Sequence, residues 1–388
     1  MPSSSVGRNE MLEAETFHPS ELSPADAVAW RAMCAARPEF ESPLLGPGFA
    51  QAVGEVRQDA RVTVWREAGR PVAFLAHHRR PGGLARPIGS PLSDYHALIS
   101  QGAIDVPSAL ERAGLGGWRF TGLLDPFRAF ESHCEAPRQS YVLKLTGSVE
   151  DYLEQIRARS AKRFKNYRRL GHKLEREVGP MRMVVGDRDP AALATLIDWK
   201  RAQFARTGGE DFLSPDWTRA LMWRLFETDG AEFGGLMVNL YVGDKLAVGH
   251  FGVRAGPVYH PWIASADPEL AAWSPGQLFF LQAIAAMPSA GLTTYDLGPG
   301  HDHYKAPFAL VGRSLSSGWV AAAGPAGRRM RTAERMLQLV GANGEGAVGR
   351  LRRRLDTIAS LELSVPGRVR KFATAVVGRM TAGPAEAA

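Results

Sequence analysis

The chain has 388 residues, of which 45% are hydrophobic and 22% charged, and it contains two cysteines. This length predicts two domains, each large enough for its own core, and the composition is typical of a soluble globular protein. Two cysteines provide neither a disulfide framework nor a metal cluster, and they fit a reducing compartment. The first 17 residues lack the apolar segment of a signal peptide, and no run of 18 apolar residues predicts a membrane span.

The net charge of +7 comes from the C-terminal end of the chain. Residues 324–388 hold twelve Lys and Arg against five Asp and Glu, which leaves 35 residues of each sign in the preceding 323. We therefore expect no DNA or other polyanion as a partner of the main body, whereas the basic C-terminal segment needs its own explanation.

The first half of the chain has the pattern of an α/β unit. Ser23-Pro24 starts a helix, a hairpin covers 61–78, and a strand over 94–100, a helix over 106–113 and a strand over 118–123 follow. The same order of hairpin, strand, helix and strand recurs over residues 236–297. This weak internal repeat favours two similar α/β units in tandem.

Residues 150–177 predict one strongly basic helix. Its side chains either form a solvated face or bind the phosphates of coenzyme A or of a nucleotide-linked or lipid-linked sugar. Arg163, Lys165 and Arg169 are the candidate substrate-binding residues. Further helices are expected over 190–205 and 215–226, and Trp199, Lys200 and Arg201 on the first of them are candidates to line an acceptor cleft.

The central stretch of the sequence runs from residue 259 to residue 305. A strand over 259–266 is followed by a helix that begins Ser274-Pro275-Gly276-Gln277, where Ser274 is the expected N-cap of a capping box. This start is either an ordinary well-capped helix or a seat for an anionic group such as a pyrophosphate. A short strand over 293–297 then opens into a glycine loop and Tyr304-Lys305.

The loop after this second strand carries the candidate catalytic residues. Asp296 ends the strand, either as a base or as a cap for the glycine loop. His301 and His303 flank Asp302, but no further ligands stand at metal-site spacing, so we expect no metal, and His303 is a candidate proton shuttle. No nucleophile elbow, phosphate-binding loop or dinucleotide fingerprint is present, so covalent catalysis is not indicated.

The order of strand, Ser-Pro-Gly helix, Asp-Leu-Gly-Pro-Gly and Tyr-Lys resembles the second half of tandem GNAT-like acyltransferases. These are the CelD/BcsL enzymes of cellulose and exopolysaccharide biosynthesis, including holdfast-type polysaccharide N-acetyltransferases, with FemAB/FemX relatives. The resemblance is good over residues 142–310. It implies an α/β (α+β) fold with GNAT-like domains at 1–145 and 146–323, each a mixed twisted sheet with flanking helices, and a basic helical tail at 324–388.

The resemblance also implies an activity. We expect an N-acetyltransferase that uses acetyl-CoA as donor substrate and an amino sugar or similar amine as acceptor, in synthesis of an exopolysaccharide that serves as a cell-surface adhesin. Lys305, beside Tyr304, would stabilise charge at the transferred acyl group, and Ser274 to Gln277 would bind the donor. Two alternatives stay open: a FemX-like transferase that uses aminoacyl-tRNA, and a degenerate GNAT fold that regulates by binding cyclic di-GMP.

The basic tail predicts amphipathic helices after a fold that is complete by Gly327. Arg331 and Arg335, and again Arg350 and Arg354, stand four residues apart, so each pair can share one phosphorylated ligand. Leucines at helical spacing add an apolar stripe. The tail therefore contacts an anionic membrane, binds cyclic di-GMP, or is simply soluble, and we expect a cytoplasmic protein, either free or peripheral on the inner face of the membrane.

Overall fold

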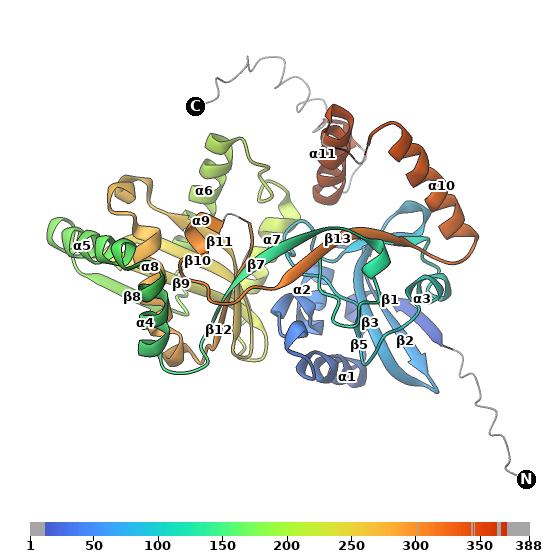
Figure 1. The fold of residues 1–388 in the computed structure, drawn as a ribbon, viewed down its shortest axis with the longest axis horizontal. Helices are drawn as coiled ribbons and strands as arrows, with labels where there is room; N and C mark the ends of the chain where they lie inside the picture. Colours follow the sequence, from blue (N-terminus) through green and yellow to red (C-terminus); the bar gives the residue numbers. More distant parts are fainter. Residues whose placement is uncertain (1–11, 301, 343, 345, 363–365, 371–388) are drawn as a thin grey trace, which may run out of the picture.

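The structure is a computed structural model that describes residues 12–300, 302–342, 344, 346–362 and 366–370. Within these residues, thirteen strands form one continuous mixed sheet, with helices on both sides (Figure 1). The strands are β1 (Glu13–Phe17), β2 (Ala60–Glu67), β3 (Arg70–Arg79), β4 (Leu84–Pro87), β5 (Ile99–Ser100), β6 (Gly117–Leu123), β7 (Cys134–Lys144), β8 (Met181–Val185), β9 (Gly234–Val242), β10 (Lys245–Ala255), β11 (Val258–Ala266), β12 (Thr294–Pro299) and β13 (Ser314–Ala321).

Eleven α-helices lie among the described residues. They are α1 (Pro24–Ala35), α2 (Pro47–Val56), α3 (Val106–Arg112), α4 (Val149–Arg159), α5 (Ala161–Glu177), α6 (Pro190–Thr207), α7 (Asp216–Glu227), α8 (Pro275–Ala286), α9 (Asp302–Lys305), α10 (Pro325–Leu339) and α11 (Ala347–Leu361). A 3₁₀ helix, η6 (Pro268–Trp273), precedes α8. The predicted α/β class is confirmed. No helix among the described residues is long and apolar enough to cross a membrane.

The two halves of the chain exchange strands at the middle of the sheet. The order is β1-β2-β3-β4-β6-β13-β7-β12-β11-β10-β9-β8, with β5 paired to β3. Thus β13 from the second half pairs with β6 of the first half, and β7 from the first half pairs with β12 of the second. Both strands cross the centre of the molecule in Figure 1. The sheet therefore runs without a break across the predicted boundary at residues 145 and 146.

An apolar core also spans the two halves. One buried cluster contains Phe49 of α2, Leu221 of α7 and Trp262 of β11, and the rings of Phe49 and Trp262 lie 5.6 Å apart. Each half has a second cluster of its own, around Trp118 in the first half and Phe279 in the second. The side chains at the junction are thus packed as in a domain interior.

Two local predictions from the sequence are wrong. The basic helix expected over 150–177 is two helices, α4 and α5, because Ser160 has φ −153° and ψ 54°. The break lets Ile156 and Phe164 both reach the core. The strand expected over 94–100 is reduced to β5 at its end, because the preceding residues run beside β6 through isolated hydrogen bonds.

The C-terminal segment is part of the fold, which corrects the prediction that the fold ends by Gly327. The last turn of α11 is buried, with Ile358 at 4% and Leu361 at 1% exposure, and burial of two such side chains contributes about 1.5–3 kcal/mol each. The turn's carbonyl groups, which lack partners within the helix, accept from three donors: Arg57 to Ser360 (3.0 Å), Arg80 to Ala359 (2.9 Å) and Trp217 to Leu361 (2.9 Å). Helix α11 therefore binds both halves of the chain.

Candidate active site

Two parallel strands in the second half separate after a short region of pairing. β11 and β12 pair at Val258 with Thr294 and at Tyr259 with Tyr295, and the described ladder between them ends there. On its other side β11 stays paired with β10, with one extra residue, Trp262, forming a β-bulge. The edge of β11 from Pro261 to Ala264 therefore has backbone groups that can bond to a ligand.

A cavity of about 180 Å³ lies between the separated strands. Its walls come from β11, β12, α6, α8, α9, β10 and the loop that follows β4. The lining side chains that carry chemistry are Asp94, Lys200, His250, Tyr304 and Lys305, and the apolar ones include Trp262, Phe280 and Leu297. The second half supplies nearly all of this surface, and the first half contributes Asp94 and its neighbours Pro91 and Leu92.

Lys305 is held at the end of β12. Its Nζ donates to the carbonyl oxygens of Leu297 (2.6 Å) and Pro299 (2.8 Å), and the residue is 9% exposed. Burial lowers the pKa of Lys305, while the carboxylates of Asp94 and Asp296 act in the opposite direction. Gly300, next to this ammonium group, has φ +116°, a backbone conformation that favours glycine.

Lys200 and His250 lie on another part of the cavity wall. Lys200 contributes a positive group and His250 a neutral one. Lys200 Nζ donates to Gln203 (3.2 Å) and more weakly to the carbonyl of Ala264 (3.4 Å). Burial, and secondarily the charge of Lys305, lowers the pKa of Lys200 to about 8. Burial together with both lysines lowers the pKa of His250 to about 3, so its ring is neutral; Nδ1 lies 2.7 Å from the Tyr295 hydroxyl.

Asp94 is the carboxylate of the cavity, and a histidine stands behind it. His260 Nε2 lies 3.1 Å from Asp94 Oδ2, and His260 Nδ1 lies 3.6 Å from Asp296 Oδ1. Burial alone would lower the pKa of His260, but the two carboxylates raise it to about 9. The protonated imidazole of His260 therefore lies between the two carboxyl groups of Asp94 and Asp296. Gly298, with φ +68°, is required here, because a Cβ would lie 2.7 Å from Asp94 Oδ2.

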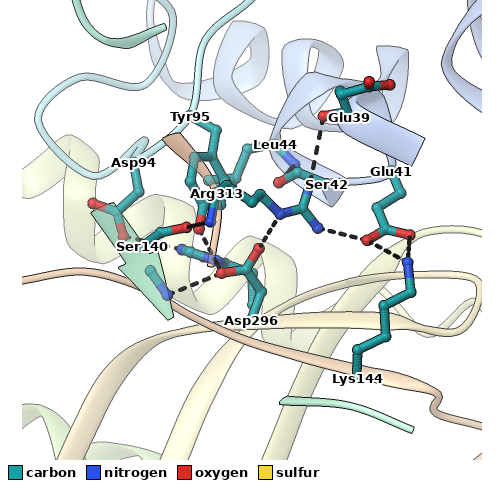
Figure 2. Close-up of polar contacts among 12 residues, drawn as sticks. Glu39, Glu41, Ser42, Leu44, Asp94, Tyr95, Ser140, Lys144, Asp296 and Arg313 are labelled. Carbon is teal, nitrogen blue, oxygen red and sulfur yellow. Dashed lines mark hydrogen bonds and ion pairs between the residues drawn. The ribbon is translucent and has the colours of Figure 1, made fainter. Parts of the chain in front are cut away.

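Asp296 lies behind the cavity wall and is fully buried (Figure 2). Its Oδ1 accepts from the Tyr95 hydroxyl (2.5 Å) and from the backbone N–H of Gly298 (2.9 Å), and its Oδ2 lies 3.5 Å from Arg313 Nε. Burial would raise the pKa of Asp296, but His260 and Arg313 hold it below its ordinary value. Because Tyr95 belongs to the first half, Asp296 joins β12 to that half.

A chain of ion pairs continues from Asp296 along the junction of the halves. Arg313 pairs with Glu41 at 2.6 Å, and Glu41 pairs with Lys144 at 3.0 Å, as Figure 2 shows. These groups lie on the far side of Asp296 from His260. The site carboxylates and His260 are therefore fixed from both halves of the chain.

The predicted site residues are only partly brought together. Tyr304, Lys305 and Lys200 line the cavity, whereas Trp199 and Arg201 do not. Asp296 does not line it either, and His260 links Asp296 to the lining residue Asp94. The predicted substrate-binding residues Arg163, Lys165 and Arg169 are exposed on α5 and do not line it. His301 and the side chain of His303 lie outside the described residues.

The predicted donor seat stands at the start of α8, away from the lining of this cavity. Ser274 is not the predicted side-chain cap: it ends η6, adopts φ 52° and ψ 53°, and gives α8 no side-chain hydrogen bond within the described structure. Gly276 has open space where a side chain would stand. The capping-box prediction is therefore wrong, although α8 begins at Pro275 as the sequence predicts.

Sequence reasoning did not find Asp94, His250 or His260 as site residues. Asp94 stands in the first half, 202 positions before Asp296, and no local pattern marks it. The two histidines sit in strands that read as ordinary core. A charged residue in an apolar strand, as at His260, was the available signal, since such groups are buried only with partners.

Comparison with known proteins identifies the second half. Residues 161–306 match the family model described as acetyltransferase (GNAT) domain. The protein is an N-acyltransferase. The match covers β11, α8, β12 and Lys305 of this N-acyltransferase, and a search of curated proteins found no match.

Several solved structures are similar to this chain at low identity. FemX is 12% identical with a TM-score of 0.52, over 82% of this chain and 99% of that chain, which confirms the predicted GNAT-like α/β architecture. A tandem GNAT protein from the clavulanic acid biosynthesis pathway is 12% identical (TM-score 0.45; 81% and 99% covered). The C-terminal domain of a putative lysylphosphatidylglycerol synthetase from Agrobacterium fabrum is 11% identical (TM-score 0.44; 81% and 97% covered).

The described residues offer no cluster of three His, Cys, Asp or Glu side chains that could hold a metal ion. The charged groups of the cavity are instead two lysines and one carboxylate. These groups can stabilise an oxyanion and accept a proton.

Proposed function

We propose that this N-acyltransferase uses acetyl-CoA to acetylate the amine of an amino sugar in bacterial exopolysaccharide synthesis, as a member of the CelD/BcsL family. The observation that carries the proposal is the gap between β11 and β12, in which Lys305 of the second half faces Asp94 of the first. The acyl donor can reach this gap along the second half of the chain, and the amine acceptor can reach it from the first half.

The unpaired edge of β11 suits the amide groups of the donor's pantetheine arm. Backbone groups from Pro261 to Ala264 would hydrogen-bond to these amides as a neighbouring strand does. The diphosphate of coenzyme A would lie farther out, at the start of α8, where Gly276 leaves space and free N–H groups favour an anion. The 180 Å³ cavity is small, which favours an acetyl over an aminoacyl group.

The proposed reaction is direct acyl transfer. The amine loses a proton to Asp94 and its nitrogen attacks the thioester carbonyl, so that a C–N bond forms while the carbonyl becomes an oxyanion. Lys305 stabilises that oxyanion. The intermediate then collapses with cleavage of the C–S bond. Burial raises the pKa of Tyr304, so its hydroxyl stays protonated and can supply the proton to the leaving thiolate.

The same geometry assigns a positioning role to Asp296. Through His260 it keeps a positive charge behind Asp94, and it holds the Gly298 turn that leads to Lys305. Lys200 adds a second positive charge near the carbonyl of Ala264. Direct contact with substrate is assigned to Asp94, Tyr304 and Lys305.

A second candidate function, membrane contact, rests on the exposed surface of α10 and α11. Large apolar side chains that are 38–81% exposed lie on these helices and on the turn between them: Met336, Leu337, Leu339, Val340, Val348, Leu351 and Leu355. Exposed arginines, among them Arg335 and Arg350, lie beside them. Such a surface suits the anionic inner face of the cytoplasmic membrane.

Cyclic di-GMP is proposed as a competing ligand of the same arginines. These are the pairs Arg331 with Arg335 and Arg350 with Arg354, and Arg331 also donates to the carbonyl of Ala322 (3.0 Å). Flotation with anionic vesicles tests both proposals, with and without the nucleotide. The paired substitutions Leu339→Glu and Val340→Glu should abolish flotation, and equal recovery of this variant and the wild type would remove the membrane proposal.

The test of the main proposal is titration of acetyl-CoA by calorimetry, followed by mass spectrometry of products from a panel of amino sugars. We expect binding of acetyl-CoA and a mass gain of one acetyl group on at least one amino sugar. Absence of acetyl-CoA binding would overturn the donor assignment, and acetylation confined to amines without a sugar would overturn the acceptor assignment.

A further inference from the structure

A second cavity, of about 560 Å³, lies on the other side of Asp94. Asp94 and Pro91 line both cavities, so the two spaces meet at the proposed base. The remaining walls of the second cavity come from β4 and the loop after it, from β6, β7, β12 and β13, and from α11. Its size falls in the range of small-molecule sites, roughly 300–1,000 Å³.

Helix α11 is held in place as one wall of this second cavity. Asp356 of α11 pairs with Arg86 of β4 at 2.7 Å. Glu334 of α10 joins Arg352 of α11 (2.7 Å) to Arg119 of β6 (2.6 Å). Together with the anchored last turn described above, these pairs give α11 a defined position over the cavity. Helix α11 is thus placed to contact a ligand that reaches Asp94 through the second cavity.

The charge of the lining decides between classes of ligand. Four arginines line the cavity against three carboxylates: Arg86, Arg119, Arg138 and Arg353, with Asp94, Glu135 and Asp356. Two of the arginines are neutralised by ion pairs, Arg86 with Asp356 and Arg119 with Glu334. A diphosphate would need a clear excess of positive charge, so this nearly balanced lining disfavours a nucleotide-linked sugar.

The polar groups of the lining match a neutral, polyhydroxylated ligand instead. Six residues with a side-chain hydroxyl line this space: Ser90, Ser93, Thr121, Ser317, Thr357 and Ser360. The hydroxyls of Ser93, Thr357 and Ser360 donate to backbone carbonyls, and their oxygens can still accept from a ligand. A hydroxyl can both donate and accept, as the hydroxyls of a sugar do. The first cavity, at about 180 Å³, leaves no room for sugar units beyond the reacting groups.

We propose that the second cavity binds the sugar units next to the amine-bearing unit of an oligosaccharide acceptor, and that α11 forms one wall of this acceptor site. The amine then reaches Asp94 from the second cavity while the donor occupies the first. This inference rests on the proposed amino-sugar acetylation and adds that the acceptor is a neutral saccharide chain. It also gives the C-terminal helix a role in acceptor binding.

The test fills the second cavity from two different walls. Thr357→Trp on α11 and Thr121→Trp on β6 each place an indole in it, and Val348→Trp on the exposed part of α11 is the matched control. The probes are an N-acetylglucosamine tetramer in which one terminal unit has a free amine, a glucosamine monomer and UDP-glucosamine. Tetramer binding is measured by calorimetry, rates are measured with acetyl-CoA, and thermal melting checks the fold.

We expect the wild type to bind the tetramer at least 10-fold more tightly than the monomer or UDP-glucosamine. Both cavity-filling variants should lose that preference while their acetyl-CoA affinity stays within 2-fold of wild type, and the control should be unchanged. Tetramer binding that both folded variants retain, or tighter binding of UDP-glucosamine, would overturn the inference. Failure to bind acetyl-CoA in the wild type would instead overturn the proposed function.

Discussion

The two halves of the chain contain the same pair of separated parallel strands, but only one gap is open. In the first half, β4 and β6 pair at Leu84 with Gly117 and at Ala85 with Trp118, as β11 and β12 do in the second half. The first gap is filled by the chain itself. His96 N–H donates to Gly122 (3.0 Å), and Leu124 N–H donates to His96 (2.8 Å).

This difference shows how the same strand arrangement forms the proposed donor site in the second half and a wall of the proposed acceptor site in the first half. The segment that closes the first gap carries Tyr95 inward to Asp296 and Asp94 into the cavity of the second half. The segment that closes the gap of the first half thus places the carboxylate of Asp94 in the cavity of the second half, at a position where the strands of the second half provide no carboxylate. The following predictions alter one side of the comparison at a time.

The largest effect is expected at the filled gap. Asp94→Asn removes the proposed base and keeps the shape of the side chain, so kcat for amine acetylation should fall roughly 10²–10³-fold. Asp105→Asn, an exposed carboxylate change in the same half, is the control. Steady-state kinetics with unchanged kcat in the Asp94 variant would show that the first half supplies no chemical group.

In the open gap, Lys305→Ala should lower kcat by roughly 10²-fold, since one oxyanion-stabilising group is lost, with the Kd of acetyl-CoA little changed. Lys245→Ala, at the exposed start of β10, serves as the control. Rapid-quench measurement of the chemical step separates this effect from product release. A variant that loses donor affinity but keeps kcat would make Lys305 a donor-binding residue.

The helix start beside the open gap should affect donor affinity alone. Gly276→Asp places a carboxylate where the diphosphate is expected, so the Kd of acetyl-CoA should rise at least about 10-fold. Gln282→Glu adds the same charge farther along α8 at an exposed position. If calorimetry gives equal affinities for both variants, the diphosphate lies elsewhere.

The smallest effect concerns pH and the junction of the halves. The pKa of His260 is raised to about 9 in the folded protein, against about 6.5 for an unperturbed histidine. Its stabilising effect is therefore complete below about pH 6.5 and is lost as the pH rises through 9. Between pH 6.5 and 9, the Tm of the His260→Gln variant should therefore fall by a few degrees less than the Tm of the wild type. His172→Gln, at an exposed site, should leave the pH dependence of Tm unchanged.

The sequence predicted those parts of the site that depend on local pattern. The strand–helix–strand order around α8 and the position of Lys305 follow from apolar runs, turn residues and the motif order of the second half. The same local reasoning failed at Ser274, where the preceding 3₁₀ turn imposes a left-handed backbone that the capping-box pattern does not reveal.

The rest depends on contacts between residues that are far apart in the sequence. The exchange of β7 and β13 and the approach of Asp94 to His260 join segments about 150 or more positions apart. The basic pattern of α11 indicated a free amphipathic helix, because the partners that bury its last turn, Arg57 and Trp217, lie in the other parts of the chain. Local periodicity carries no information on such pairings.

The most direct test of the assigned donor gap is amide hydrogen exchange with and without acetyl-CoA. The account predicts slower exchange on ligand addition in peptides that cover 258–266 and 274–278, with no change in peptides that cover 84–89 and 117–123. Protection confined to the first half, or bound acetyl-CoA that leaves β11 unprotected, would contradict the assignment of the open gap as the donor site.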